Sequence, residues 1–225
     1  MELQPRLIDV AVPRDPTGAV LVLHGGASRR ANMMVSPAQL SVLRMVPVAR
    51  RIDRMSDHRL AVFRVLNSRR GWDTRHTPVV DAEWALDCAA ERIGRALPAC
   101  LVGHSLGGRA ALLAASRPEV QSVVALAPWV YPTDVASGLA GKRILIVHGS
   151  ADRIASPQRS AALARALSQE TEVAYITISG GKHAMLARHA SFDGLAAQFA
   201  VLTLCGITTG GPMSRIASGE RQFRL

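Results

Sequence analysis

The fold is decided by a stretch near the middle of the chain, residues 99–115, which reads ACLVGHSLGGRAALLAA. A short apolar run ends at Gly103, and an alanine-rich segment of helical character begins just after Ser105. Residues 103–107 match the pattern G-x-S-x-G, whose glycines leave room for a sharp turn from a strand into a helix. In this context the pattern predicts that the Ser105 hydroxyl stands above the end of a parallel strand, where it can act as a nucleophile.

Short apolar runs rich in valine, isoleucine and leucine recur on both sides of this stretch, with helical patterns between them. This alternation is typical of βαβ units and of a mostly parallel sheet covered by helices on both faces. We predict one α/β domain with about seven strands. The predicted strands cover residues 6–12, 19–24, 60–66, 99–103, 122–127, 143–148 and 172–178.

Capping signals and apolar periodicity predict the helices. Ser36 and Gln39 form a Ser-x-x-Gln capping box around a proline, and the pair Thr77-Pro78 repeats the cap-plus-proline pattern. The predicted helices begin near residue 37 and cover residues 77–96, 106–116, 157–168 and 189–202.

Asp152 and His183 are the residues predicted to activate the serine. A serine hydroxyl is a weak nucleophile unless a histidine takes its proton and an acid orients that histidine. Asp152 follows the predicted strand 143–148, and His183 follows the predicted strand 172–178 after a Gly-Gly turn. The order Ser105, Asp152, His183, with each residue after its own strand, therefore indicates a Ser-His-Asp triad.

Two other residues are alternatives for the same roles. Asp134 follows the strand that ends at Ala127 and could be the acid, while His189 could be the base. We favour Asp152, and we favour His183 because His189 lies in a predicted helix with no glycine turn to present it. Three further histidines flank glycines at strand ends and are expected to be structural: His24, His104 and His148.

A glycine-rich loop after the second predicted strand is expected to complete the site. It reads His24-Gly25-Gly26-Ala27, and its glycines allow backbone N–H groups to approach a substrate. We predict that the N–H groups of Gly26 and Leu106 form an oxyanion hole, with the N–H of Ala27 as the alternative to that of Gly26, and that Ala27 contacts the substrate.

Four motifs, HGG, GHSLGG, HGSADRIASP and GGKHAML, together span residues 24–186 and resemble the α/β-hydrolase superfamily. The set is most similar to small bacterial members with little or no lid, related to dienelactone hydrolases and carboxylesterases. The nucleophile is Ser105 and not the cysteine of dienelactone hydrolase itself, which argues against dienelactone as the substrate. The resemblance implies a single-domain α/β-hydrolase fold.

The loop after the fifth predicted strand is short, and in this superfamily a large cap domain normally enters there. Only 14 residues, 128–141, are present, so we expect a minimal cap or none and an open site. Three aromatic residues are predicted to form the substrate pocket: Trp72, Trp129 and Tyr131.

The composition is that of one globular domain. The chain has 225 residues, of which 48% are hydrophobic, enough for one sizeable core. No apolar run approaches the ~18 residues of a membrane span, and the amino terminus lacks the apolar segment of a secretory signal. We therefore expect a cytoplasmic protein without a membrane partner. Residues 1–205 are predicted to form the domain, and residues 206–225, which show no period, a mobile tail.

Arginine dominates the charge. The formal net charge is +10, and the 27 basic residues include only two lysines. Eleven arginines lie in residues 29–75, but only 4% of the chain is aromatic and no zinc-finger, RNP-type or basic-zipper pattern occurs, so nucleic-acid binding is not predicted. Four arginines lie nearest the strand ends and could receive an anionic substrate group: Arg29, Arg30, Arg69 and Arg70.

These features predict a serine hydrolase that cleaves small-molecule carboxylic esters through an acyl-enzyme. The three cysteines have no paired spacing, no metal-ligand pattern is present, and neither a metal nor an organic cofactor is expected. One alternative is an acyl thioesterase on coenzyme A or carrier-protein substrates, which the arginine-rich stretch motivates. Another, of a different class, is a weakly active hydrolase-like binding protein.

Overall fold

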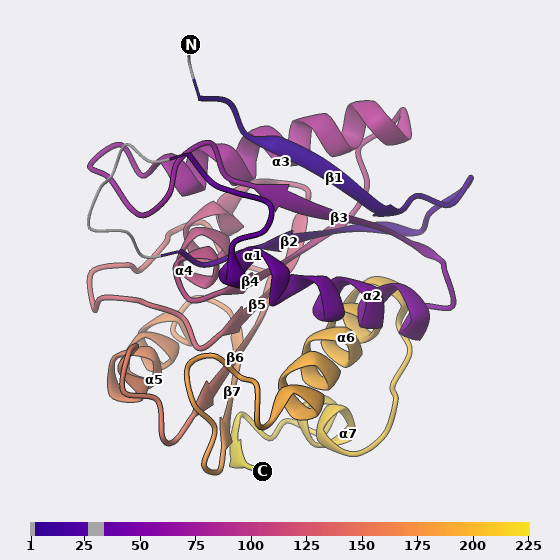
Figure 1. Ribbon diagram of the computed structural model, residues 1–225. Helices are drawn as coiled ribbons and strands as arrows, with labels where there is room; N and C mark the ends of the chain where they lie inside the picture. Colours follow the sequence, from indigo (N-terminus) through magenta and orange to yellow (C-terminus); the bar gives the residue numbers. More distant parts are fainter. Residues whose placement is uncertain (1–2, 27–33) are drawn as a thin grey trace.

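A computed structural model describes residues 3–26 and 34–225 (Figure 1). Its centre is an eight-stranded sheet in the order β1-β3-β2-β4-β5-β6-β7-β8, in which β1 is antiparallel to β3 and all other neighbours are parallel. The strands are β1 (Arg6–Ala11), β2 (Gly18–Leu23), β3 (Leu60–Leu66), β4 (Ala99–His104), β5 (Val120–Leu126), β6 (Arg143–Gly149), β7 (Glu172–Ile178) and β8 (Gln222–Arg224). The predicted mostly parallel sheet is confirmed, and β8 is the strand that the sequence does not predict.

Helices cover both faces of the sheet, as predicted (Figure 1). One face carries α3 (Thr77–Ile93), α4 (Leu106–Leu113) and α5 (Pro157–Leu167), and the other carries α2 (Met45–Met55), α6 (His189–Cys205) and α7 (Pro212–Ala217). The short helices α1 (Leu40–Leu43) and η1 (Ala114–Ser116) complete the set. Within the described residues, no helix is both long enough and apolar enough to cross a membrane.

Two helix boundaries differ from the prediction for local reasons. The capping box predicts a helix from residue 37, but the helix begins at Leu40, because the Gln39 amide donates to Ser41 Oγ instead of closing the box. Helix α3 begins at Thr77 as predicted and ends at Ile93, because Gly94 takes a left-handed conformation with φ 84° that terminates the helix.

The segment after residue 206 forms α7 and β8, whereas the sequence predicts a mobile tail without regular structure. Met213, Ile216 and Phe223 are buried there, and β8 pairs in parallel with β7. Met213 and Ile216 have the spacing of one helix face, but two such residues are too few to establish a helical period, and Phe223 alone establishes no strand period. The segment is therefore recruited by contacts with α6 and β7 rather than by its own pattern.

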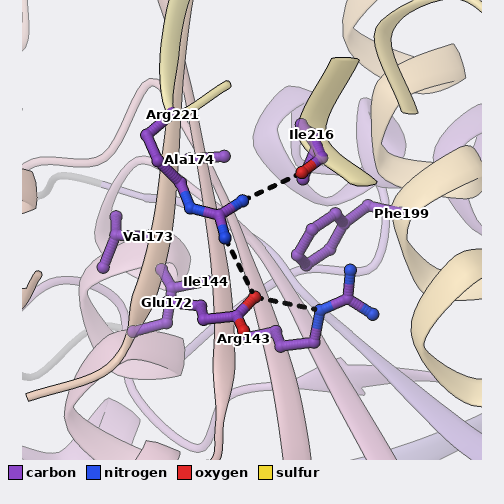
Figure 2. Close-up of a pocket in the computed structure, with 8 residues that line it drawn as sticks. All are labelled: Arg143, Ile144, Glu172, Val173, Ala174, Phe199, Ile216 and Arg221. Carbon is purple, nitrogen blue, oxygen red and sulfur yellow. Dashed lines mark hydrogen bonds and ion pairs between the residues drawn. The ribbon is translucent and has the colours of Figure 1, made fainter. Parts of the chain in front are cut away.

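Charged side chains fasten this segment to the sheet, as Figure 2 shows. Glu172 at the start of β7 lies 3.5 Å from Arg221 Nη2 and 3.8 Å from Arg143 Nε. Arg221 also donates through Nη1 to the Ile216 carbonyl at 2.9 Å, and the Arg143 guanidinium lies 5.7 Å from the centre of the Phe199 ring. The start of β8 is thus held to β7 through Arg221 and Glu172 and to α7 through the Ile216 carbonyl.

Candidate active site

Ser105 occupies the sharp turn between β4 and α4. Its backbone has φ 56° and ψ −117°, a conformation that costs a non-glycine residue about 1–3 kcal/mol. A Cβ atom on Gly103 would lie 2.1 Å from the Gly107 carbonyl oxygen, and one on Gly107 would lie 2.5 Å from the Leu23 carbonyl oxygen. Only glycine fits at both positions, which explains the G-x-S-x-G pattern and places the start of α4 against the end of β2.

The three predicted triad residues are brought together. Ser105 Oγ lies 3.0 Å from His183 Nε2, and His183 Nδ1 lies 2.8 Å from Asp152 Oδ2. The Asp152 side chain is buried, while that of His183 is 17% exposed. Because an ionised carboxylate only accepts, Nδ1–H donates to Asp152 and leaves Nε2 free to accept the serine proton.

Close contact between two loops brings the acid and the histidine to the same place. A Cβ atom on Gly149 would lie 2.2 Å from the Gly181 carbonyl oxygen, and the Ala151 N–H donates to that same carbonyl at 2.9 Å. The loop after β6 and the loop after β7 therefore run against each other. This places Asp152 beside His183, although 31 positions separate them in the sequence.

Asp152 accepts four hydrogen bonds. Oδ1 receives the backbone N–H groups of Ile154 at 2.8 Å and Ala155 at 3.0 Å, and Oδ2 receives His183 and, at 3.1 Å, His148 Nε2. Burial alone raises the pKa of the Asp152 carboxyl, but the hydrogen bonds from His148, His183 and Ile154 outweigh burial and hold this pKa well below its usual range. The side chain is therefore an ionised acceptor. The contact from His148 was not predicted.

His104 supports the loop that carries His183. Its Nε2–H donates to the His183 carbonyl at 2.9 Å, and the two rings lie 5.0 Å apart. Burial, with a smaller contribution from His183, lowers the pKa of His104 to about 3. His104 is thus neutral at ordinary pH, in agreement with the structural role predicted for it.

The loop predicted to supply an oxyanion donor lies directly against Ser105. A Cβ atom on Gly25 would lie 2.9 Å from Ser105 Cβ, and Gly26 has φ 150°, which favours glycine. His24 fixes this loop, because its Nδ1–H donates to the Gly25 carbonyl at 2.5 Å and its Nε2 accepts the Asn67 N–H at 3.2 Å. Burial lowers the pKa of His24, in keeping with this neutral form. Ala27 lies outside the described residues.

A cavity of about 750 Å³ opens at Ser105 and His183. Four aliphatic side chains that line it are also largely exposed, namely Leu40, Leu43, Ile154 and Leu186. Its wall also contains the buried ion pair in which Arg44 Nη2 lies 2.6 Å from Asp193 Oδ1. Arg44 Nε donates to the Ala184 carbonyl at 3.2 Å, so this pair ties the loop after β7 to α2 and α6.

Of the three predicted aromatic walls, Trp129 lines this cavity and the other two do not. Trp72 and Tyr131 instead hold Arg109, whose guanidinium lies 4.0 Å and 4.9 Å from the two ring centres. Arg109 follows Ser105 by one helical turn, and its contacts could not be read from the spacing of the aromatic residues.

The alternative acid is engaged elsewhere. Asp134 Oδ1 lies 2.7 Å from Arg109 Nη2, and Oδ2 accepts the Tyr131 N–H at 2.8 Å. The alternative base, His189, is exposed at the start of α6 and lines the cavity. The geometry thus groups Ser105 with His183 and Asp152.

Among the four arginines expected near the site, Arg70 lines the cavity and its Nε is buried without a hydrogen-bond partner. Arg69 follows the same strand and is not among the lining residues. Arg29 and Arg30 lie outside the described residues.

Comparison with known proteins identifies the family and the fold. A family model described as PET hydrolase-like matches residues 87–202. A structure of an α/β serine hydrolase homologue from Coxiella burnetii matches with 17% identity over 87% of this chain and 90% of that one, with a TM-score of 0.64. A serine hydrolase without a lid from Xanthomonas campestris matches with 19% identity over 92% of this chain and 89% of that one, with a TM-score of 0.64.

Est1E from Butyrivibrio proteoclasticus, in a structure with ferulic acid bound, matches with 16% identity over 89% of this chain and 96% of that one, with a TM-score of 0.66. At these identities the solved structures show a shared fold. A comparison with curated protein sequences finds no match.

Proposed function

Because this chain belongs to the PET hydrolase-like family of α/β hydrolases, we propose that it hydrolyses carboxylic esters through Ser105, His183 and Asp152. The observation that carries the proposal is the unbroken hydrogen-bond path from Ser105 Oγ through His183 to Asp152, with distances of 3.0 Å and 2.8 Å, on the wall of an open cavity. This geometry suits nucleophilic catalysis by serine.

In the proposed first half-reaction, Ser105 Oγ attacks the ester carbonyl carbon while His183 Nε2 takes the serine proton. The negative charge on the carbonyl oxygen is stabilised by the N–H groups of Gly26 and Leu106, aided by the positive end of the α4 dipole. His183 then returns its proton to the leaving alcohol as the carbon–oxygen bond breaks, and an acyl-enzyme remains.

In the second half-reaction, water takes the place of the alcohol. His183 accepts a proton from water, whose oxygen attacks the acyl carbon, and the same proton passes to Ser105 Oγ as the acid leaves. Asp152 holds the histidine in the tautomer with Nδ1–H and stabilises the imidazolium in both halves. Water is the only co-reactant that the proposal needs.

The cavity supports a small-molecule substrate with an apolar portion. Leu40, Leu43, Ile154 and Leu186 surround its opening and remain exposed, so an apolar acyl or alcohol group would bury additional surface there. The ferulic acid held by Est1E and the esterases among the structural neighbours support an ester as the substrate class.

A fluorophosphonate probe tests the proposal directly, because it reacts with an activated serine. The wild type should be labelled at Ser105 and should hydrolyse 4-nitrophenyl acetate, and Ser105→Ala should lose both properties. Labelling that persists in Ser105→Ala would contradict the assignment. Labelling of the wild type without turnover on a panel of esters would favour the weakly active binding protein.

One observation favours acyl thioesters as a second candidate. Arg70 lines the cavity with its Nε unpartnered, and a guanidinium group is well suited to phosphate oxygens such as those of coenzyme A. The proposed chemistry is unchanged, since a thiolate replaces the alkoxide as leaving group. Comparing acetyl-coenzyme A with a neutral thioester of the same acyl group separates phosphate recognition from general thioesterase activity.

A further inference from the structure

His148 lies at the end of β6 with a fully buried side chain. Its Nε2 lies 3.1 Å from Asp152 Oδ2, the same oxygen that His183 Nδ1 approaches to 2.8 Å. Two histidines therefore share one carboxylate oxygen. Only His183 contacts Ser105, and His148 is not among the residues that line the cavity.

The neighbours of His148 offer a complete set of hydrogen bonds to a neutral ring. An ionised carboxylate only accepts, so Nε2 of His148 carries a proton and donates it. On the other side of the ring, the closest neighbour of Ser160 Oγ is His148 Nδ1 at 2.7 Å, ahead of the Pro157 carbonyl at 3.0 Å and the Tyr175 hydroxyl at 3.1 Å. With the Ser160 proton directed along this shortest contact, Ser160 donates to Nδ1, and Tyr175 donates to the Pro157 carbonyl at 3.0 Å. Every polar atom in this set is satisfied by a neutral His148.

A neutral histidine is also what the proposed chemistry requires at this position. When Ser105 loses its proton, His183 becomes a cation that Asp152 must stabilise. A second buried cation at His148 would compete for the same carboxylate and would pay its own desolvation cost. A neutral donor instead draws electron density from Oδ2 without adding charge.

We propose that His148 is a positioning residue that acts through Asp152: as a permanently neutral donor to Oδ2, it weakens the hold of Asp152 on the His183 proton and lets the base work at lower pH. The inference rests on the proposed function, because it requires His183 to be the base. The expected sign follows from hydrogen bonding, since a carboxylate that loses a donor attracts the remaining proton more strongly and raises the pKa of its partner.

Among residues 3–26 and 34–225, few other titratable groups face this pair of histidines. His183 is faced by Asp152 and, from the end of β4, by His104, which is neutral. Arg44 acts on His104 through its charge. His148 is faced by Asp152 and, through Ser160, by the Tyr175 hydroxyl from β7. Burial raises the pKa of Tyr175, so this phenol is neutral over the pH range of interest.

The test is the acid limb of the kcat/KM profile against pH for 4-nitrophenyl acetate, which reports the base in the free enzyme. His148→Met removes the donor at similar volume and should shift the acid limb to higher pH by about one unit. At pH values below the acid limbs of both the wild type and the variant, kcat/KM of the variant should then be about tenfold lower. His148→Gln keeps an amide N–H and should restore most of the shift. KM should stay within about twofold, because His148 does not line the cavity.

Ser122→Ala is the matched control. It removes another buried polar contact of the sheet, the 2.8 Å hydrogen bond between Ser122 and Thr203, and should lower stability without moving the limb. If His148→Met lowers kcat at every pH with the limb unmoved, or moves the limb down, the inference is wrong, since those results indicate loosened packing or a displaced Asp152.

A second measurement does not depend on a variant that folds. The ring ¹⁵N shifts of His148 in the wild type should report the neutral Nε2–H tautomer across the pH range in which His183 titrates. A doubly protonated His148 anywhere in that range would overturn the inference. Failure of the proposed function would look different, because Ser105→Ala would then retain hydrolysis whatever the state of His148.

Discussion

Two regions of the sheet differ in whether their polar side chains have partners. At the carboxyl ends of the central strands several buried polar atoms have none, whereas the charged groups beside β7 and β8, at the carboxyl-terminal edge of the sheet, are paired. Among the described residues, five buried side-chain nitrogen or oxygen atoms have no hydrogen-bond partner: Arg44 Nη1, Asn67 Oδ1, Arg70 Nε, His104 Nδ1 and Arg109 Nε. Three of these residues line the Ser105 cavity. The other two flank it, since the Asn67 N–H contacts His24 in the loop after β2 and Arg109 lies one turn into α4.

At the carboxyl-terminal edge, the charged groups find partners. Glu172 lies between Arg143 and Arg221, as Figure 2 shows. Arg215 pairs with Glu220 and lies 3.8 Å from the centre of the Phe223 ring. The hollow lined by Arg143, Glu172 and Arg221 has no space that a water molecule could occupy.

The contrast distinguishes residues that affect folding stability from residues that affect turnover or binding. An unpartnered buried polar atom costs about 1–3 kcal/mol, and the strained turn at Ser105 adds to that cost. These costs are concentrated in residues that line or flank the cavity. Substitutions near the cavity should therefore change turnover or binding, whereas substitutions at the edge should change the free energy of unfolding.

The largest effect is expected at the acid. Asp152→Asn should lower kcat by about 10⁴-fold, because an amide can donate to Nδ1 and so favour the wrong imidazole tautomer. Asp134→Asn, the matched control, should leave kcat nearly unchanged, because that carboxylate serves Arg109 and the Tyr131 N–H. Steady-state kinetics on one ester decides between them, and the reverse ranking would move the acid to Asp134.

The second effect lies at the edge of the sheet. Phe223→Ala removes a buried ring between β8 and Arg215 and should lower the free energy of unfolding by about 3 kcal/mol. Urea denaturation measures this loss, and kcat and KM of the folded variant should match the wild type. A large fall in kcat at a temperature where the variant is folded would show that the two regions are coupled.

The sequence predicts only part of the fold and of the candidate site. The grouping of Ser105, His183 and Asp152 is predictable because each lies in a local motif at a strand end, and parallel strands bring their carboxyl ends to one edge of the sheet. The eighth strand is not, because Met213, Ile216 and Phe223 are buried by contacts with distant elements and show no period of their own. Its strand register exists only once β7 is in place.

Side-chain partners across the fold are the other part that the sequence does not predict. Trp72 and Tyr131 were expected to face the substrate but instead pack on Arg109, a residue of the helix that follows the nucleophile. His148 was expected to be structural, yet it contacts Asp152 four residues further on. His148 lies at the end of β6 and Asp152 lies in the turn that follows. This four-residue spacing is the sequence signal that could have identified the contact.

The third effect is expected at the aromatic side chains near the cavity. Trp129→Ala should raise KM for an ester with a bulky apolar acyl group by about tenfold, because the side chain lines the cavity. Trp72→Ala should leave KM within about twofold, since that ring packs on Arg109 and is not among the residues that line the cavity. Kinetics with short and bulky acyl groups distinguishes the two positions, and equal KM effects would mean that both rings meet the substrate.

The smallest effect is expected at Arg70, a charged side chain that lines the cavity and has fewer partners within the protein than Arg44. Arg44 is paired with Asp193, but the Arg70 Nε has no partner. Arg70→Gln should lower kcat/KM for mono-4-nitrophenyl succinate by about threefold to tenfold and leave 4-nitrophenyl butyrate, which has the same chain length, nearly unchanged. Arg159→Gln removes an equal charge from outside the cavity and serves as the control.

Salt provides the independent check on this last prediction, because screening weakens an attraction between exposed charges but does not affect a neutral substrate. Raising the ionic strength should therefore reduce kcat/KM of the wild type for the succinate ester and abolish most of its advantage over Arg70→Gln, while the butyrate ester shows little change. An equal response of both esters, or an equal loss in Arg159→Gln, would mean that Arg70 is an ordinary solvated arginine. The unpartnered atoms around the cavity would then reflect the strain of building the triad rather than recognition of a charged substrate.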